Sequence, residues 1–146
     1  MRPINGLSPR EIQDLFGFYM SFKSNKPYRQ VDITYCFDNF VIGDGELLIN
    51  NRKKTFKWGE IRPFFNLKRS SLKKHGIGTL ATILPLEKLV EAKELQYCYR
   101  YERGDSVSPI RQMHYLKVGI DINSNICLDQ YLTRFRRYAA KKGFEF

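Results

Sequence analysis

The sequence has few of the features that mark secreted, membrane-spanning or metal-binding proteins. Its 146 residues include only three cysteines, an odd number at wide spacing, so we interpret them as reduced thiols rather than a disulfide framework. No apolar run approaches the roughly 18 residues that span a bilayer, and the polar N-terminus lacks the apolar stretch of a signal peptide. These absences predict a cytoplasmic protein without a membrane segment.

Residues with recognisable catalytic or metal-binding spacing are also scarce. The two histidines, His75 and His114, have no cysteine or acidic partner at the spacing of a zinc site. Gly43-Asp44-Gly45 lacks the Lys-Ser/Thr of a phosphate-binding loop, and we interpret it as a hairpin turn. The sequence therefore predicts no catalytic residue, no metal and no cofactor.

One group of acidic residues keeps a nuclease as the alternative enzyme. It consists of Asp32, Asp38, Asp44 and Glu46. Magnesium-dependent nucleases need clustered carboxylates, and such an activity would depend on Asp44 or Glu46. The alternating spacing is more typical of the polar face of a strand and its turn.

What the chain does have is positive charge in one place. Of the formal net charge of +10, residues 51–75 contribute +8, with nine Lys and Arg against Glu60 alone. Residues 1–50 are close to neutral, so residues 51–75 are the electropositive part of the chain. Concentrated cations attract polyanions because each neutralised phosphate releases condensed counterions. The segment predicts contact with nucleic acid.

Local patterns predict an α+β fold, a small mostly antiparallel sheet with flanking helices, within a single domain of residues 1–146. Ser8 and Glu11 form a Ser-x-x-Glu capping box, and apolar residues at helical spacing extend the first helix to Met20. Alternation over residues 31–38 predicts a strand, followed by a hairpin over residues 40–49.

Further helices are predicted over residues 78–94, with a kink at Pro85, and from Ser124 or Asn125 to Lys142. The last helix has a stripe that we expect to be buried: Leu128, Leu132, Phe135 and Ala139. Residues 96–103 and 113–119 are predicted to form a long hairpin.

The basic segment contains Glu60-Ile61-Arg62-Pro63-Phe64-Phe65-Asn66-Leu67-Lys68-Arg69-Ser70-Ser71-Leu72-Lys73-Lys74-His75. This pattern resembles the helix-turn-helix motif of bacterial transcriptional regulators. The resemblance implies a supporting helix from Glu60, a turn at Asn66-Leu67 and a recognition helix over residues 69–75, which would enter the major groove. Arg62 departs from the motif, which has a small residue there, and Lys68 replaces its polar cap.

The nucleic-acid-binding residues predicted on this basis are Arg52, Lys53, Lys54, Lys57, Lys68, Arg69, Ser70, Lys73 and Lys74. The first four would neutralise flanking phosphates, and the others belong to the resembling segment. The downstream hairpin would then be similar to the wing of a winged-helix domain, with Arg100, Arg103 and Arg111 near its tip. Residues 1–50 would form a dimerisation or partner-binding part, because a two-fold operator needs two copies.

The leading hypothesis is a DNA-binding transcriptional regulator that acts as a homodimer on duplex DNA. Two alternatives stay open. One is a basic interaction module that adapts or inhibits a nucleoprotein complex. The other is an RNA-binding protein, in which the alternating Tyr97, Tyr99 and Tyr101 would stack on bases. Such alternating tyrosines are more often part of a sheet core.

Overall fold

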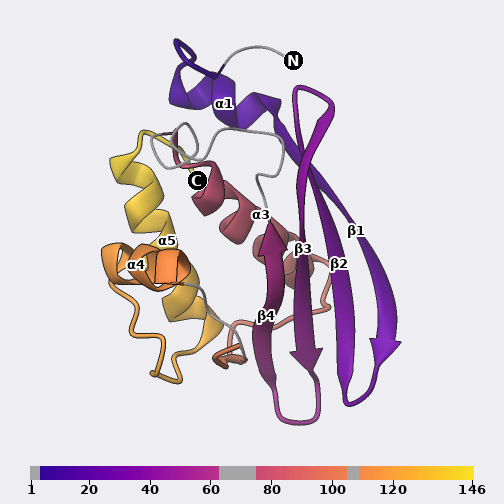
Figure 1. Cartoon of the computed structure of the whole chain (residues 1–146). Coiled ribbons are helices and arrows are strands. Elements are labelled where there is room, and N and C mark those ends of the chain that lie inside the picture. Colours follow the sequence, from indigo (N-terminus) through magenta and orange to yellow (C-terminus); the bar gives the residue numbers. More distant parts are fainter. Residues whose placement is uncertain (1–3, 63–74, 105–108) are drawn as a thin grey trace.

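Four long strands follow one another along the chain and pair as an antiparallel meander (Figure 1). They are β1 (Phe16–Asn25), β2 (Tyr28–Phe37), β3 (Phe40–Asn50) and β4 (Thr55–Arg62). The two-residue β5 (Arg100–Tyr101) pairs in parallel with β4, so the strand order is β1-β2-β3-β4-β5. The computed structural model describes residues 4–62, 75–104 and 109–146, and they confirm the predicted α+β fold with a mostly antiparallel sheet.

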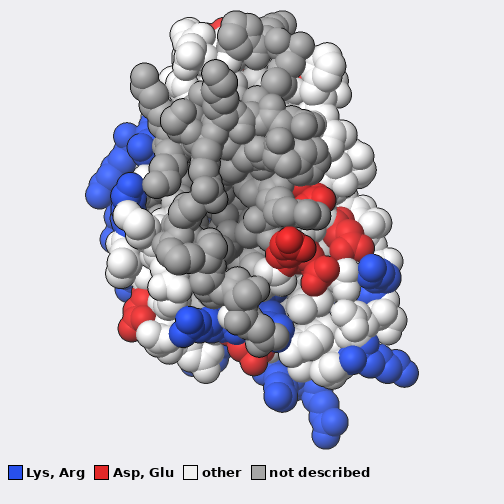
Figure 2. Space-filling view, viewed as in Figure 1, with Lys and Arg blue, Asp and Glu red and all other residues white. Residues whose placement is uncertain are grey.

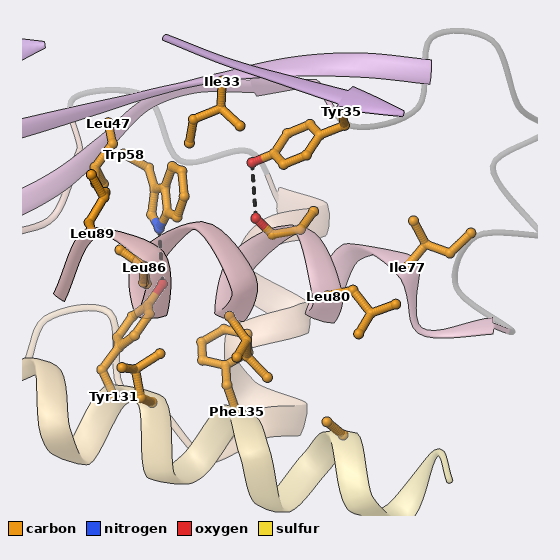
Figure 3. Close-up of a cluster of buried hydrophobic side chains, with 14 of the residues drawn as sticks. Ile33, Tyr35, Leu47, Trp58, Ile77, Leu80, Leu86, Leu89, Tyr131 and Phe135 are labelled. Carbon is orange, nitrogen blue, oxygen red and sulfur yellow. Dashed lines mark hydrogen bonds between the residues drawn. The ribbon is translucent and has the colours of Figure 1, made fainter. Parts of the chain in front are cut away.

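The helices lie to one side of this sheet and form two layers (Figure 1). They are α1 (Pro9–Leu15), α3 (Ile77–Glu91), α4 (Pro109–Val118) and α5 (Leu128–Lys141). Figure 3 shows α3 between the sheet and α5, with Ile33 and Leu47 on the sheet side and Phe135 on the α5 side. Because α3 is covered from both directions, most of its residues from Ile77 to Leu89 are buried. None of the described helices is both long and apolar enough to cross a membrane.

Three sequence predictions depend on local signals, and the structure confirms them. Ser8 and Glu11 form the capping box, with a reciprocal pair of hydrogen bonds of 3.1 Å. Strand β2 buries alternate residues, as predicted. All four stripe residues of α5 are buried, although the helix begins at Leu128, after Cys127, rather than near Ser124.

The first helix is shorter than predicted, because Phe16 starts a strand. The apolar residues Ile12 and Phe16 fit a helical stripe, but Phe16, Phe18 and Met20 also alternate along one face of a strand. Pairing of β1 with β2 over its full length decides between these periodicities. Tyr19 also fits the helical spacing from Ile12 and would be buried on that stripe, but it is 59% exposed.

The turn predicted at Gly43-Asp44-Gly45 is also wrong, because these residues continue through β3. The chain turns instead at Asp38-Asn39, whose φ values of 50° and 66° are both positive. Two consecutive left-handed residues make the two-residue hairpin turn that matches the twist of paired strands, and Asp and Asn tolerate this conformation.

The predicted long hairpin of residues 96–119 is wrong, and with it the wing of a winged-helix domain. Only Arg100–Tyr101 is a strand, and residues 109–118 form helix α4. Tyr99 and Tyr101 are buried in the core, where Tyr101 stacks on Tyr131 of α5 at 5.3 Å between ring centroids. Tyr97, by contrast, is 46% exposed, so the alternation of tyrosines does not mark a long strand pair with one buried face.

Candidate nucleic-acid interface

The β3–β4 turn presents three of the predicted cations to solvent. Asn50 is buried, and its side-chain Oδ1 accepts a 2.9 Å hydrogen bond from the backbone N–H of Lys53. Arg52, Lys53 and Lys54 are all exposed. Among the residues that the structure describes, none of these three forms an ion pair. The turn is thus held by Asn50 while its charges remain available.

A neighbouring strand adds a fourth predicted cation, Lys57. Lys57 is on β4, opposite Leu48 of β3. Its Nζ is 4.9 Å from the centre of the Tyr28 ring on β2. A cation over an aromatic face is attracted by the ring quadrupole. The interaction directs the Lys57 ammonium across the outer face of the sheet, toward the ends of β1 and β2.

The segment that follows α3 packs beside this turn. The Tyr99 hydroxyl donates to Asn51 Oδ1 at 2.9 Å, and the Arg100 N–H donates to the Lys54 carbonyl at 3.0 Å. Arg29 Nε is 2.9 Å from Glu94 Oε2. These contacts bring residues 92–100 to the same end of the sheet as the β3–β4 turn.

The turn between β1 and β2 lies at this end too, because strands in a meander reverse at alternate ends. We name the whole region the basic end; its cations are Lys26, Arg52, Lys53, Lys54, Lys57, Lys93 and Arg100. Figure 2 shows Lys and Arg side chains gathered along the lower edge of the molecule, where Figure 1 places the β3–β4 turn. Glu94, an acidic residue in this region, is neutralised by Arg29.

The structure brings together Arg52, Lys53, Lys54 and Lys57 but does not describe the other predicted binding residues. Lys68, Arg69, Ser70, Lys73 and Lys74 fall in residues 63–74, outside the described part of the chain. Glu60 and Ile61 belong to β4, so a supporting helix does not begin at Glu60. The rest of the helix-turn-helix hypothesis stays a prediction.

The arginines expected at the tip of a wing have separate positions. Arg100 is in β5, and its Nη1 donates to the Asn125 carbonyl at 2.7 Å. Arg103 donates to Asn123 Oδ1 at 3.2 Å, and Arg111 belongs to helix α4. Only Arg100 joins the basic end.

Sequence reasoning missed Lys26 and Lys93, which the fold adds to this region. Because the sequence predicts a helix up to Met20 in place of β1, it does not place Lys26 on a hairpin turn. Lys93 has a φ of 61° in the turn after α3, and nothing local indicates that this turn lies beside the β3–β4 hairpin. Recognising β1 as a strand would have placed Lys26 on a hairpin turn; Lys93 required the tertiary structure.

The acidic residues of β2 and β3 are arranged along a sheet face rather than around a metal. Asp32 lies opposite Glu46, and the Gln30 amide donates to both, at 2.8 Å and 3.1 Å. Asp44 precedes Glu46 by two residues in β3, and Asp38 is in the hairpin turn. The described residues contain no group of three or more side chains placed to hold a metal ion.

A separate ion pair engages one arginine of α5. Arg136 Nη2 is 2.6 Å from Glu87 Oε1 on α3. Partial burial lowers the pKa of the Arg136 guanidinium, but the hydrogen bond and charge of Glu87, with a smaller contribution from Tyr97, outweigh this effect and raise the pKa. Arg136 therefore joins the two helical layers and contributes no free charge to a surface.

His75 has a polar contact near the N-terminus, His114 packs against aromatic rings, and the cysteines form no disulfide. His75 Nε2 is 3.3 Å from Asn5 Oδ1, and the His114 ring packs against Phe135 and Tyr138 at 5.7 Å and 5.8 Å between centroids. The three cysteines are free thiols.

Comparison of the chain with protein families, with curated proteins and with solved structures found no match.

Proposed function

We propose that this chain binds duplex nucleic acid, with DNA as its ligand, by placing the basic end against the sugar–phosphate backbone. The observation that carries the proposal is the exposed triplet Arg52, Lys53 and Lys54 on a turn that Asn50 holds in place. Each phosphate that such cations neutralise releases condensed counterions, which favours binding at low salt. Lys57 and Arg100 extend the same surface.

The surroundings of the aromatic residues favour a duplex over a single strand. Proteins that bind single strands stack bases on exposed aromatic rings. At the basic end, the Tyr99 side chain is buried and its hydroxyl donates to Asn51, and one face of the Tyr28 ring is covered by Lys57. Tyr101 is buried as well. Tyr97, which is 46% exposed, is the exception, so charge outweighs stacking surface in this region, which suits contact with phosphates.

Regulation of transcription is the further part of this proposal, and it requires base readout. Phosphate contacts fix the position of a protein on a duplex, whereas contacts to base edges select a sequence. We assign that second role to Arg69, Ser70, Lys73 and Lys74, on the resemblance of their segment to a helix-turn-helix. A regulator should prefer one duplex over bulk DNA by at least about 1,000-fold in competition. An adaptor of a nucleoprotein complex should show no such preference.

The backbone part of the proposal is tested by the salt dependence of duplex binding. The variant carries Arg52→Ala, Lys53→Ala and Lys54→Ala, and its affinity for a labelled duplex is measured by fluorescence anisotropy at several salt concentrations. The slope of log K against log salt should fall in magnitude by about 2.7, because each lost phosphate contact contributes about 0.9. An unchanged slope would exclude the β3–β4 turn from the interface.

A matched control removes the same charge elsewhere on the surface. Lys117→Ala, Arg137→Ala and Lys141→Ala together also replace one arginine and two lysines, all of them exposed on α4 and α5. The control should keep the slope of the unaltered protein. Equal losses in the two variants would show that net charge, rather than the basic end, governs binding.

A further inference from the structure

Strand β1 forms a long edge of the sheet. It is ten residues long and lies at the end of the strand order, with β2 as its partner among the described strands. An edge strand has N–H and C=O groups that point away from the sheet and can pair with another strand. Proteins usually protect such edges by proline, bulges, charged residues or a short strand. β1 contains no proline, pairs with β2 without a register shift, and has Lys23 as its one charged residue.

The hydrogen-bond alternation identifies which residues point outward. The Asp38 N–H donates to the Leu15 carbonyl at 2.9 Å, just beyond the Phe16–Phe37 pair. In an antiparallel ladder, pairs that exchange hydrogen bonds alternate with pairs that do not. Gly17, Tyr19, Ser21 and Lys23 are therefore the residues that bond to β2. Phe18, Met20 and Phe22 direct their backbone N–H and C=O groups to the open edge.

The side chains of these three outward-bonding residues form an apolar row. Phe18, Met20 and Phe22 lie opposite Tyr35, Ile33 and Val31 of β2. The β2 residues are buried, whereas Phe18 and Met20 are only partly buried and Phe22 is 40% exposed. The core is thus incompletely covered along β1, beside backbone groups that pair with none of the described strands. Both conditions would be relieved by one more strand.

We propose that a second copy of this chain supplies that strand, with β1 pairing antiparallel to β1 about a two-fold axis at Met20. In this register Met20 faces Met20 of the second copy, and Phe18 faces Phe22. Lys23 faces Gly17, so like charges are not opposed. Phe18, Met20 and Phe22 direct their backbone groups outward and also face one another across the axis. The same register therefore forms both the backbone hydrogen bonds and the apolar contacts. This self-complementarity favours a second copy over an unrelated strand.

Oligomeric state in the absence of nucleic acid tests this pairing. Sedimentation equilibrium should show a dimer whose dissociation constant rises by about tenfold or more in Met20→Lys, since two ammonium groups would meet at the axis. Leu116→Lys makes the same charge change on α4, where Leu116 is 73% exposed, and should leave the dimer unchanged. A protein that stays monomeric at its highest soluble concentration, or a dimer unaffected by Met20→Lys, would overturn the proposal.

Cross-linking tests the register. In a Cys98→Ser background, which removes the exposed thiol, Met20→Cys should form an intermolecular disulfide because facing Cα atoms in a bonded pair are about 5.5 Å apart. Ser24→Cys is the control: it would lie about 27 Å from its counterpart, eight residues along the ladder. Equal cross-linking at both positions, or none at Met20, would contradict this register.

Discussion

The hydroxyl of Tyr35 donates a 3.0 Å hydrogen bond to the backbone carbonyl of Ala81, four residues before Pro85 in helix α3 (Figure 3). Proline has no N–H, so Pro85 cannot supply the helical hydrogen bond to this carbonyl. Strand β2 thus provides a donor that the helix itself lacks. Tyr35 and Pro85 are both buried, so water does not replace the missing donor readily.

Replacing Tyr35 by Phe should lower the free energy of unfolding by about 1–3 kcal/mol, because the Ala81 carbonyl would stay buried without this donor. Urea denaturation provides the measurement. In a Pro85→Ala background an N–H is present at position 85, so the same replacement should cost less by about 1 kcal/mol. Equal costs in both backgrounds would show that the hydroxyl and Pro85 are not coupled.

A second buried polar contact joins the sheet to α5 and α4. Trp58 Nε1–H donates to the Tyr131 hydroxyl at 3.2 Å, and the Tyr115 and Tyr131 hydroxyls are 2.8 Å apart. All three side chains are buried. Tyr131→Phe should therefore reduce the free energy of unfolding by about 1–3 kcal/mol, since the Trp58 donor loses its acceptor. Tyr138→Phe, on the same helix but half-buried, is the comparison and should cost less than about 0.5 kcal/mol.

Two glycines should respond oppositely to alanine. A Cβ at Gly104 would lie 2.5 Å from the backbone carbonyl oxygen of Trp58, whereas a Cβ at Gly17 would meet nothing within 4 Å. Gly104→Ala forces backbone to move and should lower the melting temperature, by a free-energy loss of about 1–3 kcal/mol. Gly17→Ala should be neutral or stabilise by up to about 1 kcal/mol, because it reduces the freedom of the unfolded chain. Comparable losses at both sites would contradict the close approach at Gly104.

The parts of the fold that sequence predicts well depend on neighbours in the chain. The capping box needs only Ser8 and Glu11, which are three residues apart, and the buried stripe of α5 needs only helical spacing. The wrong assignments occur where two periodicities overlap or where packing decides. Phe16 suits either a helical stripe or a strand, and pairing with β2 selects the strand. Tyr99 and Tyr101 alternate as in a strand, but only Arg100–Tyr101 is a strand, and Tyr101 is buried against Tyr131 of α5.

In the candidate site, too, some residues can be identified from the sequence alone and others only from the packing of the fold. Arg52, Lys53 and Lys54 are consecutive, so composition alone identifies them, and the turn after Asn50 explains their exposure. Lys93 joins them through contacts far apart in sequence, above all the ion pair of Arg29 with Glu94. Such a juxtaposition follows from the packing of α3 against the sheet, which no local pattern of charges encodes.

The cations that the fold adds give a prediction about the extent of the interface. If the basic end contacts phosphates as one surface, Lys26→Ala combined with Lys93→Ala should reduce the magnitude of the salt slope of duplex binding by about 1.8. Lys117→Ala combined with Lys141→Ala removes the same charge from α4 and α5 and should leave the slope unchanged. A slope that responds to the β3–β4 turn but not to Lys26 and Lys93 would confine the contact to that turn. The β1–β2 turn and the segment after α3 flank the β3–β4 turn. A duplex that contacts these three parts must therefore lie across the end of the sheet rather than along one strand.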